Sequence, residues 1–172
     1  MSAEIGLLSE LRILHFEDNN FSGGLPSELG FLTKMELMYI YESSVTGPIA
    51  TELGTLTNLM ALDLEWNDLQ GLVPSELSHL TALVMLWLND NDNLTFSLPT
   101  ELRNLEQLEH LFLQGASING TISPELTNGW TNLQVLNVSD TLISGTLPTQ
   151  FCTLPVVDFD CSGSLCGCDC NC

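Results

Sequence analysis

The apolar residues of this chain recur at a fixed period. Six leucine-like positions open the same pattern at Leu11, Met35, Leu59, Leu83, Leu108 and Leu133, which are 24, 24, 24, 25 and 25 residues apart. The third copy shows the pattern most fully, as Leu59-x-x-Leu62-x-Leu64-x-x-Asn67-x-Leu69-x-Gly71-x-Val73-Pro74-x-x-Leu77-x-x-Leu80. Alternation of apolar and polar residues at the start of each copy predicts a short strand, followed by a return segment. Such units bury their apolar faces only by stacking on their neighbours.

A repeat of roughly 20 to 29 residues with this signature predicts a right-handed leucine-rich-repeat solenoid of the α/β class. We expect a parallel β-sheet on the concave face and short helical or 3-10 segments on the convex face. The solenoid is predicted over residues 1–155, and a cysteine-rich C-terminal cap over residues 152–172. Residues 4–11 match the back half of a repeat, which predicts a fragment or excised ectodomain with its targeting segment upstream.

The ninth position of each repeat is normally Asn, whose amide satisfies backbone groups in the turn that leaves the strand. The six copies carry Asn19, Ser43, Asn67, Asn91, Ala116 and Thr141. We therefore expect a hydrogen-bonded ladder that lapses in the last two repeats. Extra residues near Asp92 and Gly129 lengthen the fourth and fifth repeats and should bulge from the solenoid.

Five return segments contain Ser or Thr, or in one case Pro, followed by Glu and Leu, as at Ser27-Glu28-Leu29. A Ser or Thr cap followed by Glu predicts the start of a short helix. Stacked once per repeat, the glutamates should form an acidic column along one flank. Repetition of helix-start chemistry accounts for this column, and a cation-binding ribbon is the alternative. The five are Glu28, Glu52, Glu76, Glu101 and Glu125.

The unit Leu-x-x-Leu-x-Leu-x-x-Asn-x-Leu-x-Gly-x-Leu-Pro-x-x-Leu resembles the plant-type leucine-rich repeat of receptor-like kinase ectodomains and polygalacturonase-inhibiting proteins. This resemblance covers about residues 5–155. It implies a second, short β-element beside the main sheet and a twisted superhelix. The cysteine-rich tail is similar to the C-terminal cap of diatom-type microalgal cell-surface repeat proteins, in which the repeats are ectodomains.

The chain is strongly acidic, with a net charge of −19 and only Arg12, Lys34 and Arg103 positive. Nucleic acids and anionic membrane surfaces are therefore disfavoured as partners, whereas cations and basic proteins are favoured. No apolar run approaches the ~20 residues that span a bilayer. We predict no membrane-spanning segment within the chain.

All six cysteines lie in the last 21 residues, at Cys152, Cys161, Cys166, Cys168, Cys170 and Cys172. An even, clustered count favours a disulfide-stapled cap and an oxidising, extracellular or cell-surface location, with a thiolate metal cluster as the alternative. The connectivity is open. Four glycosylation sequons, at Asn20, Asn93, Asn119 and Asn137, also favour secretion.

The concave face is where we expect ligand binding. The candidate residues combine aromatic and acidic side chains at outward strand positions and at the turns that follow them. They are Tyr39, Tyr41, Asp63, Glu65, Trp66, Trp87, Asn89, Asp90 and Phe112. Aromatic rings rimmed by carboxylates suit a basic peptide or protein segment through cation–π and ion-pair contacts. Stacking of a glycan on the same rings is the alternative.

Catalysis and metal chemistry have weaker support. Asp63 and Glu65 share one face of a strand, but an open solenoid face offers no closed pocket to separate their pKa values. The run from Asn89 to Asn93 resembles a calcium loop but lacks the Gly and the later Glu of such loops. We predict no enzyme activity, no resident metal and no cofactor, with Ca²⁺ as the alternative.

The sequence thus predicts a non-catalytic extracellular recognition module, of the receptor-like or adhesion type, that binds a protein, peptide or glycan. A structural, cation-binding scaffold at the cell surface and an inhibitor of an extracellular enzyme are the alternatives.

Overall fold

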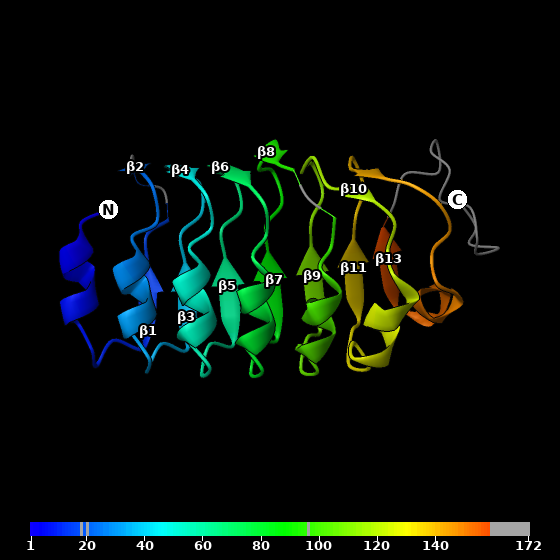
Figure 1. Cartoon of the computed structure of the whole chain (residues 1–172), viewed down its shortest axis with the longest axis horizontal. Coiled ribbons are helices and arrows are strands. Elements are labelled where there is room, and N and C mark those ends of the chain that lie inside the picture. Colours follow the sequence, from blue (N-terminus) through cyan, green and yellow to red (C-terminus); the bar gives the residue numbers. More distant parts are fainter. Residues whose placement is uncertain (18, 20, 96, 159–172) are drawn as a thin grey trace.

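The computed structural model describes residues 1–17, 19, 21–95 and 97–158. The predicted disulfide cysteines other than Cys152, and the candidate glycosylation site Asn20, lie outside these residues. The described chain forms the predicted leucine-rich-repeat solenoid, with strands on one face and 3-10 helices on the other (Figure 1). No helix within the described ranges is long and apolar enough to cross a membrane.

The main sheet has seven parallel strands in the order β1-β3-β5-β7-β9-β11-β13. They are β1 (Ile13–His15), β3 (Leu37–Tyr39), β5 (Ala61–Asp63), β7 (Met85–Trp87), β9 (His110–Phe112), β11 (Val135–Asn137) and β13 (Val156–Asp158). Six of these fall within the predicted strand segments. The sequence pattern missed β13, which continues the sheet beyond residue 155, where the predicted repeats end.

Short strands beside the main sheet confirm the second β-element that the plant-type signature implies. One sheet has the order β2-β4-β6-β8 and another pairs β10 with β12. The strands are β2 (Ser22–Gly23), β4 (Ser44–Gly47), β6 (Asp68–Gly71), β8 (Asn93–Leu94), β10 (Asn119–Gly120) and β12 (Leu142–Ile143). The signature glycines fit these turns, because Gly47 has φ +80° and Gly71 has φ +84°, values that favour glycine.

Seven 3-10 helices form the opposite face. They are η1 (Ala3–Leu7), η2 (Ser27–Phe31), η3 (Thr51–Thr55), η4 (Ser75–His79), η5 (Thr100–Asn104), η6 (Pro124–Asn128) and η7 (Thr149–Thr153). The predicted cap at Ser27 is wrong, because Ser27 is the first helical residue and Pro26 is the N-cap. In η6 a Ser does cap the helix, since the side chain of Ser123 accepts a hydrogen bond from the Glu125 N–H.

The core lies between the main sheet and the helices. In the main sheet, the middle residue of each strand from β1 to β11 is buried. The leucines at the third position of η2 to η6 are buried as well. Burying one such side chain contributes about 1.5–3 kcal/mol, so each added repeat adds to one continuous core. The periodic leucines therefore fix the register that places the outward side chains.

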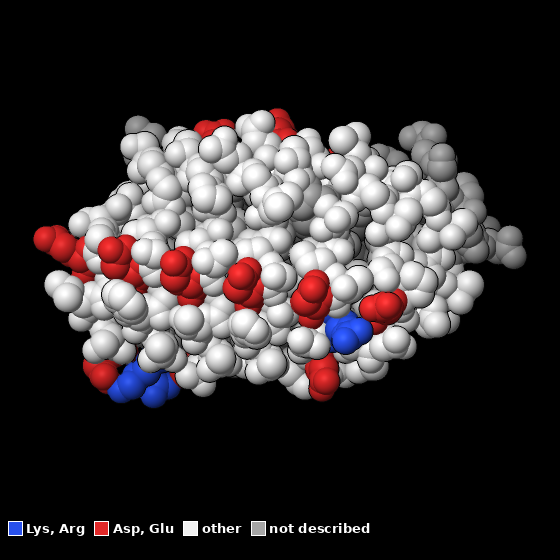
Figure 2. Space-filling model, in the orientation of Figure 1, with Lys and Arg blue, Asp and Glu red and all other residues white. Residues whose placement is uncertain are grey.

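The predicted acidic column is present. Glu28, Glu52, Glu76, Glu101 and Glu125 each occupy the first turn of a helix, and Figure 2 shows them as a row across this face. Within the described part of the chain, no group of three or more His, Cys, Asp or Glu side chains is placed to hold a metal ion. Cation binding by the column stays a prediction.

Candidate functional site

The strand register of the main sheet places side chains from successive repeats in rows. The last residue of each strand pairs with its counterpart on the next strand, which gives one row along the outward face. This row reads His15, Tyr39, Asp63, Trp87, Phe112, Asn137 and Asp158. Neighbouring strands lie ~4.8 Å apart, so adjacent members of the row are in contact range.

Four members of this row form two stacked aromatic pairs. The rings of His15 and Tyr39 stack with centroids 4.8 Å apart, and those of Trp87 and Phe112 stack with centroids 6.0 Å apart. Asp63 lies between the pairs, and its smaller side chain leaves a gap between Tyr39 and Trp87. Stacking also explains why the rings of Tyr39, Trp87 and Phe112 are half-buried, although the pattern predicts them to face solvent.

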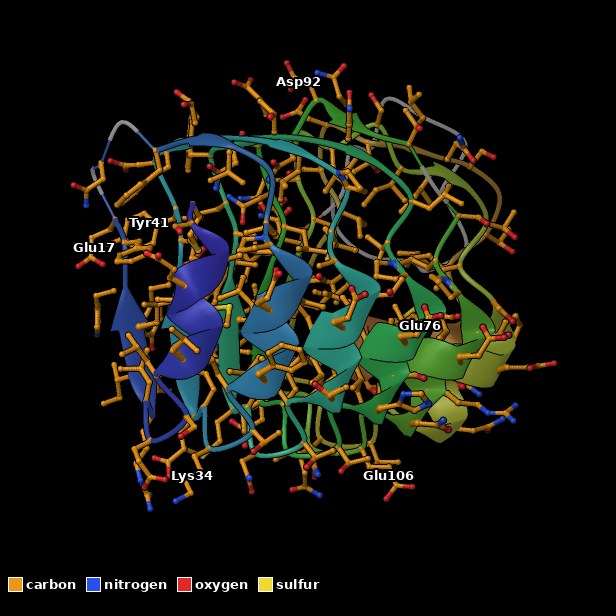
Figure 3. The ribbon with its side chains drawn as sticks, turned by 60° about the vertical axis from the view of Figure 1, so that its left-hand side comes forward. Glu17, Lys34, Tyr41, Glu76, Asp92 and Glu106 are labelled. Atoms are coloured by element: carbon orange, nitrogen blue, oxygen red, sulfur yellow. The ribbon has the colours of Figure 1, made fainter. Side chains whose placement is uncertain are left out.

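This gap is part of a groove of about 400 Å³, which we call the concave groove. It is lined by His15, Glu17, Tyr39, Tyr41, Asp63, Glu65 and Trp87. Figure 3 shows Glu17 and Tyr41 together on the sheet side of the solenoid, away from Glu76 on the helix side. The groove thus brings together five of the nine predicted binding residues and adds two that were not among them.

Asp63 is the floor of the concave groove and is only 7% exposed. Burial, together with the nearby charges of Glu65 and Glu17, raises the pKa of its carboxyl to about 7. The Glu65 N–H, which donates to Asp63 Oδ1 over 3.1 Å, opposes this shift. A positive group placed beside this buried carboxyl would favour its ionised form and pair with it.

Glu65 and Asp90 are held by Asn89, which is 1% exposed. The Asn89 side-chain amide donates to Glu65 Oε2 and to Asp90 Oδ2, each over 2.8 Å. Asn89 Oδ1 and Gln114 Oε1 are buried without a hydrogen-bond partner in the described structure. Asn89 does not line the groove itself, but its hydrogen bond holds the Glu65 carboxylate in position.

The remaining predicted residues lie elsewhere. Trp66 and Asp90 line a separate hollow of about 320 Å³ at the turns that leave β5 and β7. We call this the lateral hollow, which is lined by Ser43, Trp66, Asn67, Asp68, Asp90, Asp92 and Asn93. Phe112 does not line the groove but supports Trp87 from the next strand.

His15 and Glu17 are the groove residues that the candidate set omits. Glu17 Oε2 lies 3.2 Å from His15 Nδ1, so the two side chains form one end of the groove. Their outward strand positions in the first repeat are the signal that could have included them.

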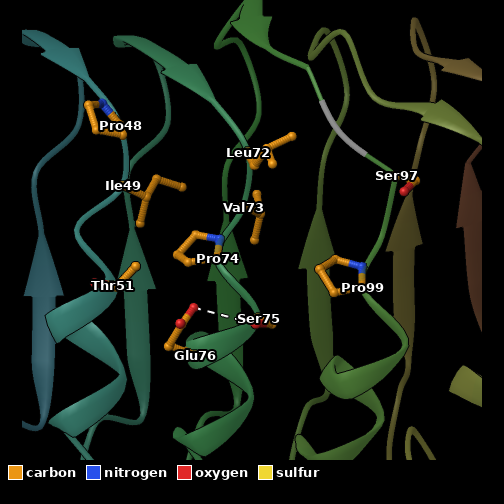
Figure 4. Close-up of a pocket in the computed structure, with 10 residues that line it drawn as sticks. All are labelled: Pro48, Ile49, Thr51, Leu72, Val73, Pro74, Ser75, Glu76, Ser97 and Pro99. Atoms are coloured by element: carbon orange, nitrogen blue, oxygen red, sulfur yellow. Dashed lines mark hydrogen bonds between the residues drawn. The ribbon is translucent and has the colours of Figure 1, made fainter.

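A third hollow lies on the helix side, between η3, η4 and the preceding turns (Figure 4). It has a volume of about 530 Å³ and is lined mainly by apolar residues, including Ile49, Leu72 and Pro74. These residues belong to the repeated Gly-x-Leu-Pro turns, so the hollow follows from the repeat geometry. Its side chains offer few of the polar groups that fix the orientation of a ligand.

Each of the three Lys and Arg side chains forms an ion pair with a glutamate of an adjacent repeat. Arg12 pairs with Glu36, Lys34 Nζ lies 2.6 Å from Glu10 Oε2, and Arg103 Nη1 lies 3.3 Å from Glu125 Oε2. Each is at least half exposed, so these pairs add little stability. Within the described residues no basic Lys or Arg side chain is near the concave groove.

Comparison with known proteins supports the fold assignment. The Leucine Rich Repeat family profile matches residues 10–32, 58–80 and 132–154. The three matched segments coincide with the first, third and sixth repeats of the solenoid, which are therefore leucine-rich repeats. No curated protein sequence matches it significantly.

Solved plant receptor structures share the fold. The plant peptide hormone receptor RGFR1, in complex with RGF2, is 29% identical with a TM-score of 0.87, over 92% of this chain and 26% of the receptor chain. A TDR receptor is 30% identical with a TM-score of 0.85, over 96% and 28% of the two chains. PEPR1 with AtPEP1 is 28% identical with a TM-score of 0.84, over 91% and 22%. This chain thus spans about a quarter of the length of these receptors.

Proposed function

We propose that this chain is a non-catalytic, extracellular recognition module that binds a peptide or protein segment in the concave groove. The observation that carries the proposal is the groove itself, in which a buried acid lies between two stacked aromatic pairs. Two of the similar receptors are complexes with RGF2 and AtPEP1, which supports a peptide as the ligand. Export and a disulfide-sealed cap belong to the same proposal.

The chemistry of the groove favours a basic ligand. Glu17, Asp63 and Glu65 supply three carboxylates, and Tyr39 and Trp87 supply aromatic faces on either side. A Lys or Arg side chain placed over Asp63 would gain ion-pair and cation–π contacts at once. The overall charge of −19 would also speed the encounter with a basic segment, more so at low salt.

The row next to the floor of the groove also favours a ligand rich in hydrogen-bond donors. Glu65, Asn89 and Gln114 follow one another on adjacent strands, and the last two carry buried oxygens that no described residue satisfies. Such unmatched acceptors are uncommon in folded proteins. A peptide supplies donors through its backbone N–H groups as well as its basic side chains.

Catalysis is not part of the proposal. Asp63 and Glu65 are tied together by the hydrogen bond from the Glu65 N–H, and Glu65 is held by Asn89. These contacts suit a fixed binding surface.

An array of immobilised short peptides and glycans tests this proposal. The unglycosylated wild-type protein is expected to prefer peptides with Lys or Arg over acidic and neutral ones, with retention that falls as salt rises. The double variant Asp63→Asn/Glu65→Gln should lose this preference, whereas Leu72→Ala, a change at an exposed residue on another surface, should keep it. Equal retention of acidic and basic peptides, or retention of glycans alone, would overturn the proposal.

A further inference from the structure

The lateral hollow contains an exposed tryptophan in an unfavourable backbone conformation. Trp66 is 56% exposed and has φ +51°. At the same position other repeats carry acids, such as Glu42 and Asp90, or Gly115. Short polar residues and glycine accept the left-handed region readily, whereas a bulky residue there is an outlier. A strained, exposed aromatic side chain points to a ligand that covers it.

The polar groups of the lateral hollow are mainly acceptors. Asp68 and Asp92 are exposed, and no described residue donates a hydrogen bond to either carboxylate. The Asn67 amide is already used, since its Nδ2 donates to backbone carbonyls and its Oδ1 accepts from the Val45 N–H. The hydroxyl of Ser43 also donates to backbone carbonyls. The hollow therefore suits a ligand rich in donors.

The acids of the hollow do not form a metal site. They are spread around its rim, and among the described residues no set of three or more acidic, His or Cys side chains is placed to hold a metal ion. A ligand with several hydroxyl donors and one apolar face matches this arrangement better. A sugar ring has both, because its C–H face can stack on Trp66 while its hydroxyls donate to the carboxylates at the rim.

The hollow also contains an attachment point for such a sugar. Asn93 is exposed, lines the hollow and begins the sequon Asn93-Leu94-Thr95. It starts β8, where its backbone pairs with Gln70 of β6, and it lines the hollow together with Trp66 and Asp68. In Figure 3 neighbouring Asp92 lies at the outer edge of the solenoid, where an attached glycan has room to extend.

We propose that Asn93 is an N-glycosylation site whose first N-acetylglucosamine stacks on Trp66 and fills the lateral hollow. In the covalent step, Asn93 Nδ2 bonds to the anomeric carbon of the sugar and loses one proton to a base of the transferring enzyme. The bond from that carbon to the lipid-linked diphosphate donor breaks, and the lipid diphosphate leaves with the electron pair. This inference rests on export, which is part of the proposed function.

The test uses the full chain, secreted behind an added leader from a eukaryotic host that attaches N-glycans, and trimmed to single sugars. Mass spectrometry gives the occupancy of Asn93 and of Asn119, an exposed sequon residue that lines neither the concave groove nor the lateral hollow. Proton NMR gives the position of each N-acetyl methyl signal. Trp66→Asn removes the ring while keeping a residue that accepts the left-handed conformation, and Thr95→Ala removes the sequon.

We expect Asn93 to be occupied and its N-acetyl methyl signal to lie upfield of that on Asn119, through the ring current of Trp66. The upfield shift should vanish in Trp66→Asn. Thr95→Ala should lower the melting temperature by about 2–4 °C in the wild-type background and by much less in Trp66→Asn.

Three results would overturn the inference. An occupied Asn93 with the same methyl signal as Asn119, and no dependence on Trp66, would show that the sugar does not fill the hollow. An empty Asn93 beside an occupied Asn119 would rule out the modification site. Basic peptides that bind the unglycosylated protein and are lost in Trp66→Asn would make the hollow a peptide site. Because the peptide array uses unglycosylated protein, failure of either proposal is seen separately.

Discussion

The first four repeats and the last two differ in the hydrogen bonds that the ninth residue of each repeat makes. In the early repeats Asn67 and Asn91 are buried, and each amide bonds to backbone groups of its own repeat and the preceding one. In the later repeats Ala116 has no polar side chain, and the Thr141 hydroxyl donates only to the Val138 carbonyl. The ladder therefore joins repeats only in the first part of the solenoid.

The helix face changes earlier along the chain, since the glycines at the fourth position of η2 and η3 are replaced by larger residues from η4 onward. Gly30 packs so tightly that a Cβ there would lie 2.7 Å from the Glu52 carbonyl oxygen of the next helix, and Gly54 packs in the same way. The equivalent residues of η4 and η5 are Ser78 and Arg103. Later repeats use other contacts, such as Trp130, whose indole N–H donates to the Leu102 carbonyl over 2.8 Å. A regular register is what stacks side chains into rows, and the concave groove lies on the regular part.

Removing a side-chain amide of the Asn ladder should give the largest difference in stability loss between the two regions. Asn91→Ala leaves the Leu69 N–H and the Leu88 carbonyl without their hydrogen-bond partner and removes bonds to two further carbonyls, so we expect a loss of about 2–4 kcal/mol in the free energy of unfolding. Thr141→Ala should cost less than about 1 kcal/mol, since it removes one half-buried bond. Chemical denaturation measures both. Equal losses would show that the ladder does not distinguish the regions.

The buried Asp63, which lies in the regular region, predicts that the stability of the fold depends on pH. Burial raises the pKa of Asp63 to about 7, well above the ordinary value of an Asp carboxyl, so the folded state keeps a proton that the unfolded state releases. Stability should therefore fall as pH rises from about 4 to 7, by an amount of order 2 kcal/mol, and stay level above.

Asp63→Asn should remove this fall and be more stable than wild type at pH 8. Asp158→Asn, in the same row but on an exposed residue of β13, should keep it. Denaturant midpoints across pH measure the effect. A wild-type profile that Asp63→Asn leaves unchanged would contradict the assignment.

The close helix packing gives the smallest expected effect. Gly30→Ala places a Cβ against the Glu52 backbone and should cost about 1–2 kcal/mol through overpacking. Ser78→Ala, at the same position of η4, adds no atom and should cost less than about 1 kcal/mol. Thermal unfolding of the two variants compares them directly. A tolerated Gly30→Ala would mean that early and late helices pack alike.

Sequence reasoning could predict the fold because the information is periodic. The leucines at fixed spacing determine strand, turn and helix, and the Asn positions indicate where the ladder weakens. The strand β13 escaped prediction because Val156, Val157 and Asp158 carry no leucine of the repeat pattern. The solenoid fold thus follows from the spacing of the repeats.

The candidate site was only partly predictable, because its properties depend on residues one repeat apart. Asp63 is buried by Tyr39 and Trp87, each 24 residues away, which no local pattern reveals. Trp66 enters the lateral hollow because its left-handed backbone turns it away from the groove row. Outward position could be predicted, whereas stacking and burial required the three-dimensional register.

The affinity of one array-selected basic peptide for three proteins tests the central claim most directly. Calorimetric titration should show that Trp87→Ala weakens binding about tenfold or more, as expected for an aromatic hot spot. Val135→Ala, on the same sheet but outside the groove, should stay within about twofold of wild type. Melting curves show that each variant is folded. If Trp87→Ala binds as wild type does, or Val135→Ala loses as much, the concave groove is not the binding site.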